Sequence, residues 1–178
     1  IDRENGKPIL KVSSQGYSGS GIGSEVETWF DLSQPQFQPL FGFSPQGNES
    51  RLRGISREKT TRAFFVRAEI HTTTFVRFTA PDGAALGQLT IDTIYAPAAN
   101  GKQYNYLRGT LPEPELDAME DLDPGPANET LMRHCMPALR DIATGRNTDR
   151  KEWLQQLLKT AKPTPEVREL RSLLKPKN

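Results

Sequence analysis

Residues 1–112 carry a hydrophobic pattern that alternates from one residue to the next, and this period of two limits the possible folds more than any other feature. The longest example is TRAFFVRAEIHTTTFVRFTA, over 61–80. Most of its apolar residues have even numbers and most of its polar residues have odd numbers, so the two kinds alternate as a half-buried strand requires. The apolar set is Phe64, Val66, Ala68, Ile70, Val76 and Phe78, and the polar set includes Arg67, Glu69, His71, Thr73 and Arg77. Because about 20 residues exceed one ordinary strand, we expect a bend or break near Thr72–Thr74.

Shorter runs on either side of this segment have the same character. They are PILKVSS, EVETWFDLS and FQPLFGFS before it, and LGQLTIDTIYA and KQYNYLRGTL after it. Asp82-Gly83 and Asn100-Gly101 separate consecutive runs, and such pairs supply the positive φ of tight hairpin turns. The pattern predicts an antiparallel meander that curls into a sandwich or partial barrel.

The C-terminal third of the sequence has a different pattern. Residues 113–126 contain six acids and no basic residue, which predicts an extended acidic, Pro-rich linker. Residues 127–178 then show helical spacing and predict about three short helices, with Thr148 and Thr164 as N-caps and a split or kink at Pro137. Strands followed by helices predict an α+β protein, with a β-rich domain over 1–112 and a helical extension over 127–178.

The loop GYSGSGIGSE, over 16–25, could in principle be a phosphate-binding or catalytic motif. A phosphate loop needs a lysine after its last glycine, a dinucleotide loop needs a following helix, and a nucleophile elbow needs glycines two residues on either side of the serine. None of these conditions holds, so the loop is predicted to join two strands. The alternative is a ligand-contacting loop, in which Tyr17, Ser18, Ser20 and Trp29 provide an anion nest and a stacking face.

Glu69 and His71 share one strand face, and Asp92 could reach them from a neighbouring strand. The three residues could form a hydrolase site, but charges at this spacing are also typical of a solvated sheet face with cross-strand pairs, which we favour. With two histidines and the single Cys135, which lies on a predicted apolar helix face, we expect no metal and no cofactor.

From residue 133 onwards the sequence has eleven Lys or Arg residues and five acidic residues, which gives a net charge of 11 − 5 = +6. This excess could attract nucleic acid or an anionic surface, although the basic residues are spread over several helix faces and fit ordinary solvated helices better. The acidic cluster of 113–123 lacks the ligand spacing of a calcium loop.

With 35% hydrophobic residues and no apolar run near 20 residues, the sequence predicts a folded protein without a transmembrane segment. A chain that starts at Ile1 favours a processed protein, secreted or from the bacterial periplasm. We therefore predict a non-enzymatic binding domain for a protein or glycan. The alternatives are the hydrolase at Glu69, His71 and Asp92, and nucleic-acid contact through the basic helices.

Overall fold

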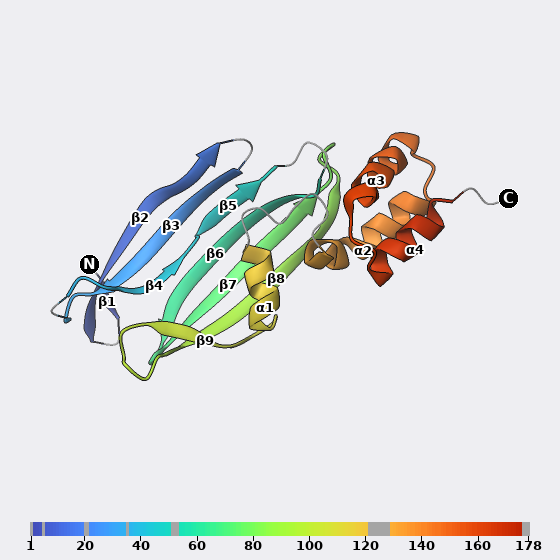
Figure 1. Cartoon of the computed structure of the whole chain (residues 1–178). Helices are drawn as coiled ribbons and strands as arrows, with labels where there is room; N and C mark the ends of the chain where they lie inside the picture. The colour runs from blue at the N-terminus through green and yellow to red at the C-terminus, as the bar shows by residue number, and fades with distance from the viewer. Residues whose placement is uncertain are drawn as a thin grey trace. The chain divides into compact units, whose positions relative to one another are not determined.

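The computed structural model describes residues 2–4, 6–19, 22–34, 36–50, 54–120 and 129–175. Side chains are described for these residues except 2–4, 17, 22, 117–120 and 129–131. The strands form one antiparallel sheet that is not closed, and helices follow it, which confirms the predicted α+β class (Figure 1).

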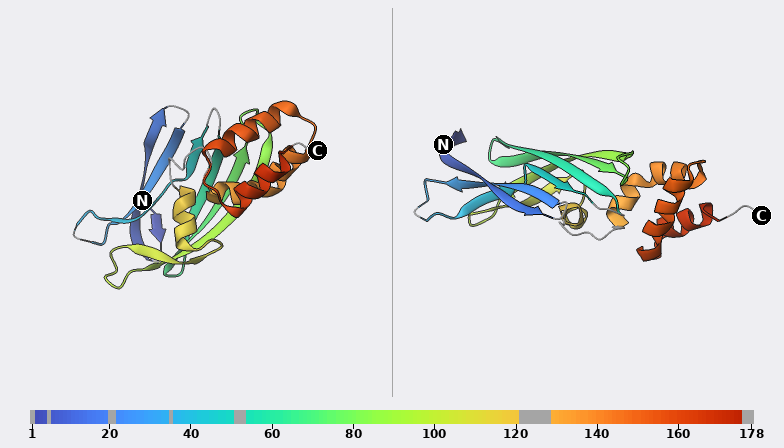
Figure 2. Two further views of the ribbon diagram at one scale, coloured as in Figure 1. Left: turned by 45° about the vertical axis from the view of Figure 1, so that its right-hand side comes forward. Right: turned by 90° about the horizontal axis from the view of Figure 1, so that it is seen from above.

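The described part of the sheet has nine strands. They are β1 (Asp2–Glu4), β2 (Lys7–Gly19), β3 (Ile22–Asp31), β4 (Pro39–Phe43), β5 (Gln46–Glu49), β6 (Ser56–Val66), β7 (Glu69–Thr79), β8 (Ala85–Pro97) and β9 (Tyr104–Gly109). Their spatial order is β1-β2-β3-β5-β6-β7-β8-β9, with β4 also paired to β3. Apart from β4, which pairs with β3 off this path, strands that are neighbours in the sheet follow one another in the chain, as in a meander, and Figure 2 shows the same succession from two further sides.

The two predicted hairpin turns are confirmed. Gly83 and Gly101 adopt positive φ values of 81° and 66°. Asp82 and Asn100 each accept a hydrogen bond from the backbone N–H two residues on, at 3.0 and 2.9 Å. The glycine supplies the backbone conformation and the side chain before it holds the turn.

The segment 61–80 is two strands rather than one, so the predicted break near residues 72–74 is wrong. β6 ends at Val66, the turn consists of Arg67 and Ala68, and Arg67 has a φ of 56°. A two-residue turn places odd residues of β6 on the same face as even residues of β7. Phe64 and Val66 were predicted to face inward, but they are 47% and 39% exposed.

The buried faces of β6 and β7 confirm this change of parity. Thr61 and Thr74 are buried, and their hydroxyls lie 2.9 Å apart. Ile70, Val76 and Phe78 are buried, as predicted.

Helix α1 (Glu113–Glu120) occupies part of the segment that was predicted to be an extended linker. Glu113 and Glu115 lie in its first turn, where carboxylates interact favourably with the positive end of the helix dipole. Pro114 also lies in this turn, where its missing N–H costs no helical hydrogen bond. Residues 113–120 are therefore helical and not extended as predicted, and residues 121–126 lie outside the described residues.

Three helices follow: α2 (Glu129–Thr144), α3 (Thr148–Thr160) and α4 (Pro165–Leu173). Pro137 lies inside α2 and does not split it. The N-cap of α3 is Asn147 rather than the predicted Thr148, because the Asn147 side chain accepts the bond from the backbone of Arg150. Thr164 caps α4, as predicted. The apolar faces contribute buried Met132, Cys135, Met136, Leu139, Leu154, Leu157, Leu158, Val167 and Leu170.

The chain contains two compact units. One comprises Ile1–Asn48, Glu58–Val76 and Thr90–Leu116, and the other comprises Glu49–Arg57, Arg77–Leu89 and Asp117–Asn178. Within the second unit, Arg150 Nε donates to Asp82 Oδ2 at 2.8 Å, and the carbonyl of His134 would lie only 3.1 Å from a Cβ at Gly87. Gly87 therefore lets α2 approach β8 closely. The predicted domain boundaries stay a prediction.

Candidate functional site

An open groove of ≈ 630 Å³ lies in the first unit. It is formed by short segments of four strands: β2, β3, β5 and β6. The lining residues are Ser13, Ser14, Gln15, Ser18, Gly23, Ser24, Glu25, Gln46, Gly47, Asn48, Glu58, Lys59 and Thr60. All of these described lining residues are polar, charged or glycine, so the site is a polar groove.

Most of the polar groove's side chains are exposed, including those of Ser13, Gln15 and Glu58. Lys59 is the exception, with an exposed fraction of 7%. Its stem lies against Gly47, where an added Cβ would come within 3.1 Å of Lys59 Cε. The absence of a side chain at Gly47 therefore leaves room for the lysine stem at the base of the groove. The lining carries two carboxylates, from Glu25 and Glu58, against the one ammonium of Lys59.

The glycine-rich loop connects β2 to β3, which confirms its role as a link between strands. Ser18 lines the polar groove. Ser20 and the side chain of Tyr17 lie outside the described residues. The other lining residues were missed by the sequence analysis. The available signal was the run of small polar residues that replaces apolar ones along the second half of β2.

Trp29, the predicted stacking residue, is fully buried with 0% exposure and does not line the groove. Its ring stacks on Phe65 at 5.2 Å between centroids, and its Nε1 donates to Glu27 Oε1 at 2.6 Å. Lys11 Nζ lies 4.7 Å from the ring centroid. Trp29 is therefore the centre of an aromatic cluster that holds the sheet face, and its indole offers no open face to a ligand. The aromatic cluster comprises Ile9, Trp29, Leu40, Phe41, Phe43, Ala63, Phe65, Ile70, Tyr95 and Tyr104.

The predicted trio of Glu69, His71 and Asp92 is only partly brought together. His71 Nε2 and Glu69 Oε2 are 3.1 Å apart on β7. Asp92 instead accepts a hydrogen bond from Thr73 Oγ1 at 2.7 Å. Phe64 lies beside His71, with ring centroids 6.0 Å apart. These contacts are cross-strand and same-strand pairs on an outer sheet face, which is the structural interpretation favoured from the sequence.

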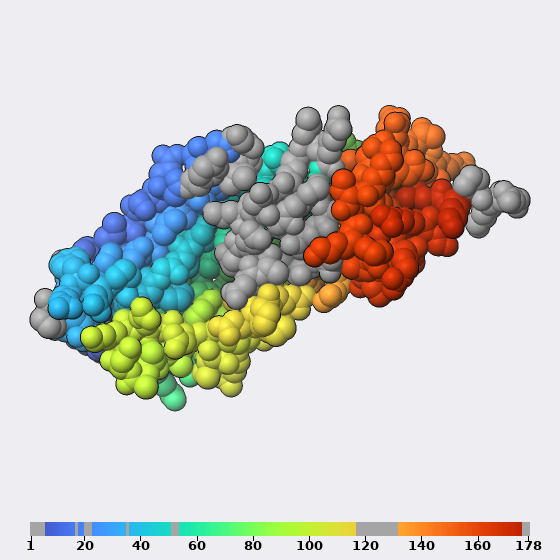
Figure 3. All heavy atoms as spheres, in the orientation of Figure 1, coloured from blue at the N-terminus to red at the C-terminus, as the bar shows by residue number. Residues whose placement is uncertain are grey.

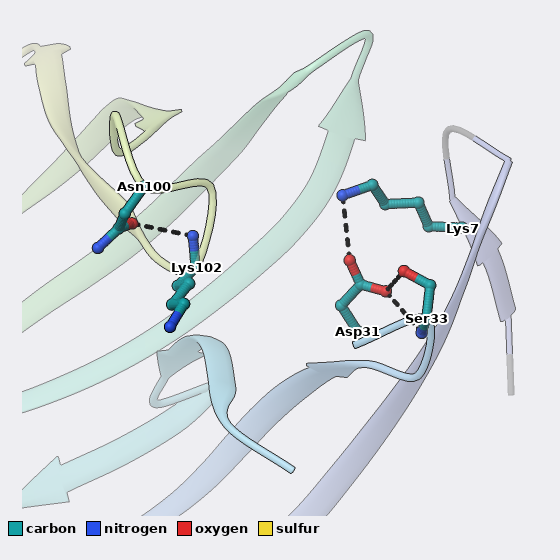
Figure 4. Close-up of polar contacts among 5 residues, drawn as sticks. All are labelled: Lys7, Asp31, Ser33, Asn100 and Lys102. Carbon is teal, nitrogen blue, oxygen red and sulfur yellow. Dashed lines mark hydrogen bonds and ion pairs between the residues drawn. The ribbon is translucent and has the colours of Figure 1, made fainter. Parts of the chain in front are cut away.

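A second hollow, of ≈ 230 Å³, lies beside the buried carboxylate of Asp31. Figure 4 shows that Lys7 and Ser33 both point at this carboxylate. Lys7 Nζ donates at 3.0 Å, and the backbone and hydroxyl of Ser33 donate at 2.9 and 2.5 Å. Burial alone would raise the pKa of Asp31, but the hydrogen bonds from Ser33 and Lys7 outweigh it and hold the pKa below its ordinary value. This carboxylate already serves to tie β2 to β3.

Two of the basic residues in the C-terminal helices, Arg140 and Arg171, make hydrogen bonds within their own unit. Arg140 makes a bidentate pair with Glu169 at 2.6 and 3.0 Å. Arg171 donates to the carbonyls of Leu158 and Ala161 at 2.5 and 3.3 Å. These contacts commit Arg140 to the contact between α2 and α4 and Arg171 to the C-terminal end of α3.

Within the described residues, no group of three or more His, Cys, Asp or Glu side chains is placed to hold a metal ion. Asp121 and Asp123 of the predicted acidic cluster lie outside those residues. Cys135 is buried in the helical core, as predicted, and burial raises the pKa of its thiol to about 12. The thiol therefore stays protonated at neutral pH and is a packing group.

No family model, curated protein or solved structure matches this chain. Among the described residues, no helix has both the length and the apolar character needed to cross a membrane.

Proposed function

We propose that this protein is a non-enzymatic binding domain and that its polar groove binds a glycan. The observation that carries the proposal is the composition of the groove, which combines serine and threonine hydroxyls, side-chain amides and carboxylates from four strands. Sugar hydroxyls both donate and accept hydrogen bonds, and hydroxyls and carboxamides can satisfy both roles. A strand scaffold holds these groups at fixed spacing, which suits a ligand with hydroxyls at regular intervals.

Other ligand classes fit the polar groove less well. Sites for drug-sized or cofactor-sized molecules are mostly apolar and largely enclosed, whereas this groove is open and polar. Nucleic acids require an excess of cations to neutralise phosphates, whereas Glu25 and Glu58 outnumber Lys59 here. The volume of ≈ 630 Å³ lies in the range of ligand sites and suits a short, hydrated oligosaccharide. A secreted or bacterial envelope setting, where glycans are abundant, is part of the same proposal.

The test is titration of the whole protein with chitohexaose, maltohexaose and a soluble peptidoglycan fragment, followed by calorimetry and by amide chemical shifts. We expect one of these probes to shift the resonances of Ser13, Gln15 and Thr60. Gln15→Ala and Glu58→Gln should each weaken that binding about tenfold, which corresponds to about 1.4 kcal/mol.

Two matched variants control for general damage. Gln88→Ala and Glu152→Gln make the same chemical changes at exposed positions outside the groove, and both should bind as the unchanged protein does. Equal losses in the control and groove variants would contradict the groove assignment, as would the absence of binding to all three probes.

Salt provides an independent discrimination between ligand classes. Binding of a neutral oligosaccharide should change little between about 50 and 200 mM NaCl, because no counterions are released. A single-stranded DNA probe that bound more tightly than the sugars, with a steep loss over the same range, would replace the glycan proposal with the nucleic-acid alternative.

A further inference from the structure

The hollow beside Asp31 is separate from the polar groove, and no described residue lines both. It has a volume of ≈ 230 Å³ and lies wholly within the first unit, between the connection from β3 to β4 and the turn from β8 to β9. Figure 3 shows the atoms of these two segments side by side, in light blue and yellow-green. We call this cavity the Asp31 hollow.

Both walls of the Asp31 hollow are held by local hydrogen bonds. In the β8–β9 turn, Asn100 Oδ1 accepts a hydrogen bond from the backbone N–H of Lys102 at 2.9 Å. In the β3–β4 connection, the backbone N–H of Gln38 donates to the carbonyl of Gln36 at 2.9 Å, and Gln38 Nε2 donates to Gln36 Oε1 at 3.2 Å. The hollow is therefore preformed, which reduces the entropy lost when a ligand binds.

Asp31 provides a buried carboxylate that can accept one more hydrogen bond. The residue is 5% exposed. Its Oδ1 accepts two hydrogen bonds from Ser33, whereas its Oδ2 accepts one, from Lys7 Nζ at 3.0 Å. Because an ionised carboxylate has about four acceptor positions, Oδ2 has room for a second donor. Lys7 would repel another ammonium at this place, so a neutral hydroxyl is the donor that fits.

Lys102 adds a positive charge from the opposite segment. It is exposed, and among the described residues no carboxylate pairs with its ammonium. Figure 4 shows Lys102 in the β8–β9 turn, across from Asp31 and Lys7. The described side chains that line the hollow or contact Asp31 therefore include two ammonium groups and one carboxylate. This balance favours a ligand with a negative charge.

The remaining side chains of the Asp31 hollow suit a hydroxylated ring. The carboxamides of Gln34, Gln36 and Gln38 line it, and carboxamides both donate to and accept from hydroxyl groups. Leu40, which is buried, offers an apolar surface to the C–H groups of a ring. The volume of ≈ 230 Å³ lies below the range of about 300–1,000 Å³ for drug-sized ligands, so it suits one sugar unit rather than several.

We propose that the Asp31 hollow binds a sugar acid, meaning a single sugar ring that carries a carboxylate, as in a uronate. The ligand carboxylate pairs with Lys102, a ring hydroxyl donates to Asp31 Oδ2, and the glutamine carboxamides bind further hydroxyls. The site uses different residues from the polar groove, so it stands whether or not the groove binds a glycan.

Other small polar ligands match fewer of these groups. An amino acid would bring its ammonium towards Asp31, where Lys7 already lies 3.0 Å from the carboxylate. A simple carboxylate such as acetate has no hydroxyl to donate to Asp31. A neutral sugar has no group that pairs with the ammonium of Lys102.

The test compares a sugar acid with its two halves. The whole protein is titrated with glucuronate, galacturonate, glucose and acetate, followed by amide chemical shifts. One of the two uronates should shift the resonances of Gln36, Gly101 and Lys102, and should bind at least about tenfold more tightly than glucose or acetate. The groove resonances of Ser13 and Thr60 should stay in place, which separates this site from the polar groove.

Variants test the charge and the carboxamides separately. Lys102→Gln and Gln36→Ala should each weaken uronate binding about tenfold, whereas Lys102→Arg should retain it because the positive charge is kept. The matched controls are Lys175→Gln and Gln155→Ala, which make the same changes at exposed positions of the second unit. Both controls should bind the uronate as the unchanged protein does.

Four outcomes would overturn the proposal. The first is the absence of shifts around the Asp31 hollow with either uronate at about 50 mM, since a site with a millimolar Kd is then nearly saturated. The second is glucose binding as tightly as the uronate, which would leave no role for the ligand's charge. The third is acetate binding as tightly, which would reduce the site to a lysine that attracts any anion. The fourth is unchanged uronate binding in Lys102→Gln.

Discussion

The β2–β3 hairpin carries two regions of opposite character. At one end, Ile9 and Trp29 are both fully buried in the aromatic cluster. At the other end, Ser13, Gln15 and Glu25 are exposed in the polar groove. Both regions belong to one continuous antiparallel register from Ile9↔Asp31 to Gln15↔Glu25. Because the backbone pairing is the same, the difference lies in the side chains: one end stabilises the sheet, and the other leaves its polar groups accessible to a ligand.

Truncation at the aromatic cluster should have the largest effect on stability. Trp29→Ala removes a ring that contacts Phe41, Phe43 and Phe65, and should lower the free energy of unfolding by about 3–5 kcal/mol. Urea denaturation measures this loss. Phe75→Ala, at a side chain that is 45% exposed, is the control and should cost about 1 kcal/mol or less. Similar losses of stability in both variants would mean that the aromatic cluster is not the end of the hairpin that stabilises the sheet.

The buried threonine pair on β6 and β7 tests whether polar groups inside the sheet are also structural. Thr61→Val alone would leave the hydroxyl of Thr74 buried without its 2.9 Å partner, and should cost about 1–3 kcal/mol. The double variant Thr61→Val/Thr74→Val removes both hydroxyls at similar volume and should recover most of that loss. Additive losses in the double variant would show that the two hydroxyls do not depend on each other.

The fold class could be predicted from the sequence because residues at two of the turns specify the backbone conformation of the turn by themselves. Gly83 and Gly101 follow Asp82 and Asn100, and each pair specifies its turn without help from distant residues. The turn at Arg67 contains neither glycine nor asparagine. The alternating patterns of β6 and β7 therefore looked like one continuous strand, and the switch of the buried positions from odd to even residue numbers was not visible. Phe64 was assigned to the wrong face for this reason.

The polar groove was harder to predict, because the strands that form it have polar residues on both faces. Along β6, the inward-facing Arg57, Lys59 and Thr61 alternate with the outward-facing Glu58 and Thr60, and all of them are charged or polar. The buried face is visible only once the strand is paired, because the long stems of arginine and lysine can pack against neighbours. The polar β5 lacked any apolar alternation and was not predicted at all.

The ion pair of Asp31 gives a pH test at the aromatic end of the hairpin. Because the folded-state pKa of Asp31 is lowered, its contribution to stability is present above the unfolded pKa of about 3.9 and is lost as the pH falls through the folded value. Asp31→Asn should cost about 1 kcal/mol at pH 7 and should unfold with a shallower acid dependence below pH 4. Parallel acid titrations of both proteins, followed by Trp29 fluorescence, measure the difference. Identical acid profiles would show that another carboxylate controls the acid transition.

The smallest effects on stability should come from the polar groove. Ser13→Ala, Ser14→Ala and Ser18→Ala remove exposed hydroxyls, and each should change the free energy of unfolding by no more than about 0.5 kcal/mol. A combined variant with all three changes should still melt close to the unchanged protein, because none of these hydroxyls is buried. The same variant should weaken the oligosaccharide binding proposed for the groove, since it removes the three serine hydroxyls of the β2 side and leaves only the carboxamide of Gln15 there. Thermal melting and calorimetry on one sample separate the two properties. A large stability loss in the triple variant would mean that the groove hydroxyls hold the hairpin together, and the division between its two ends would then fail.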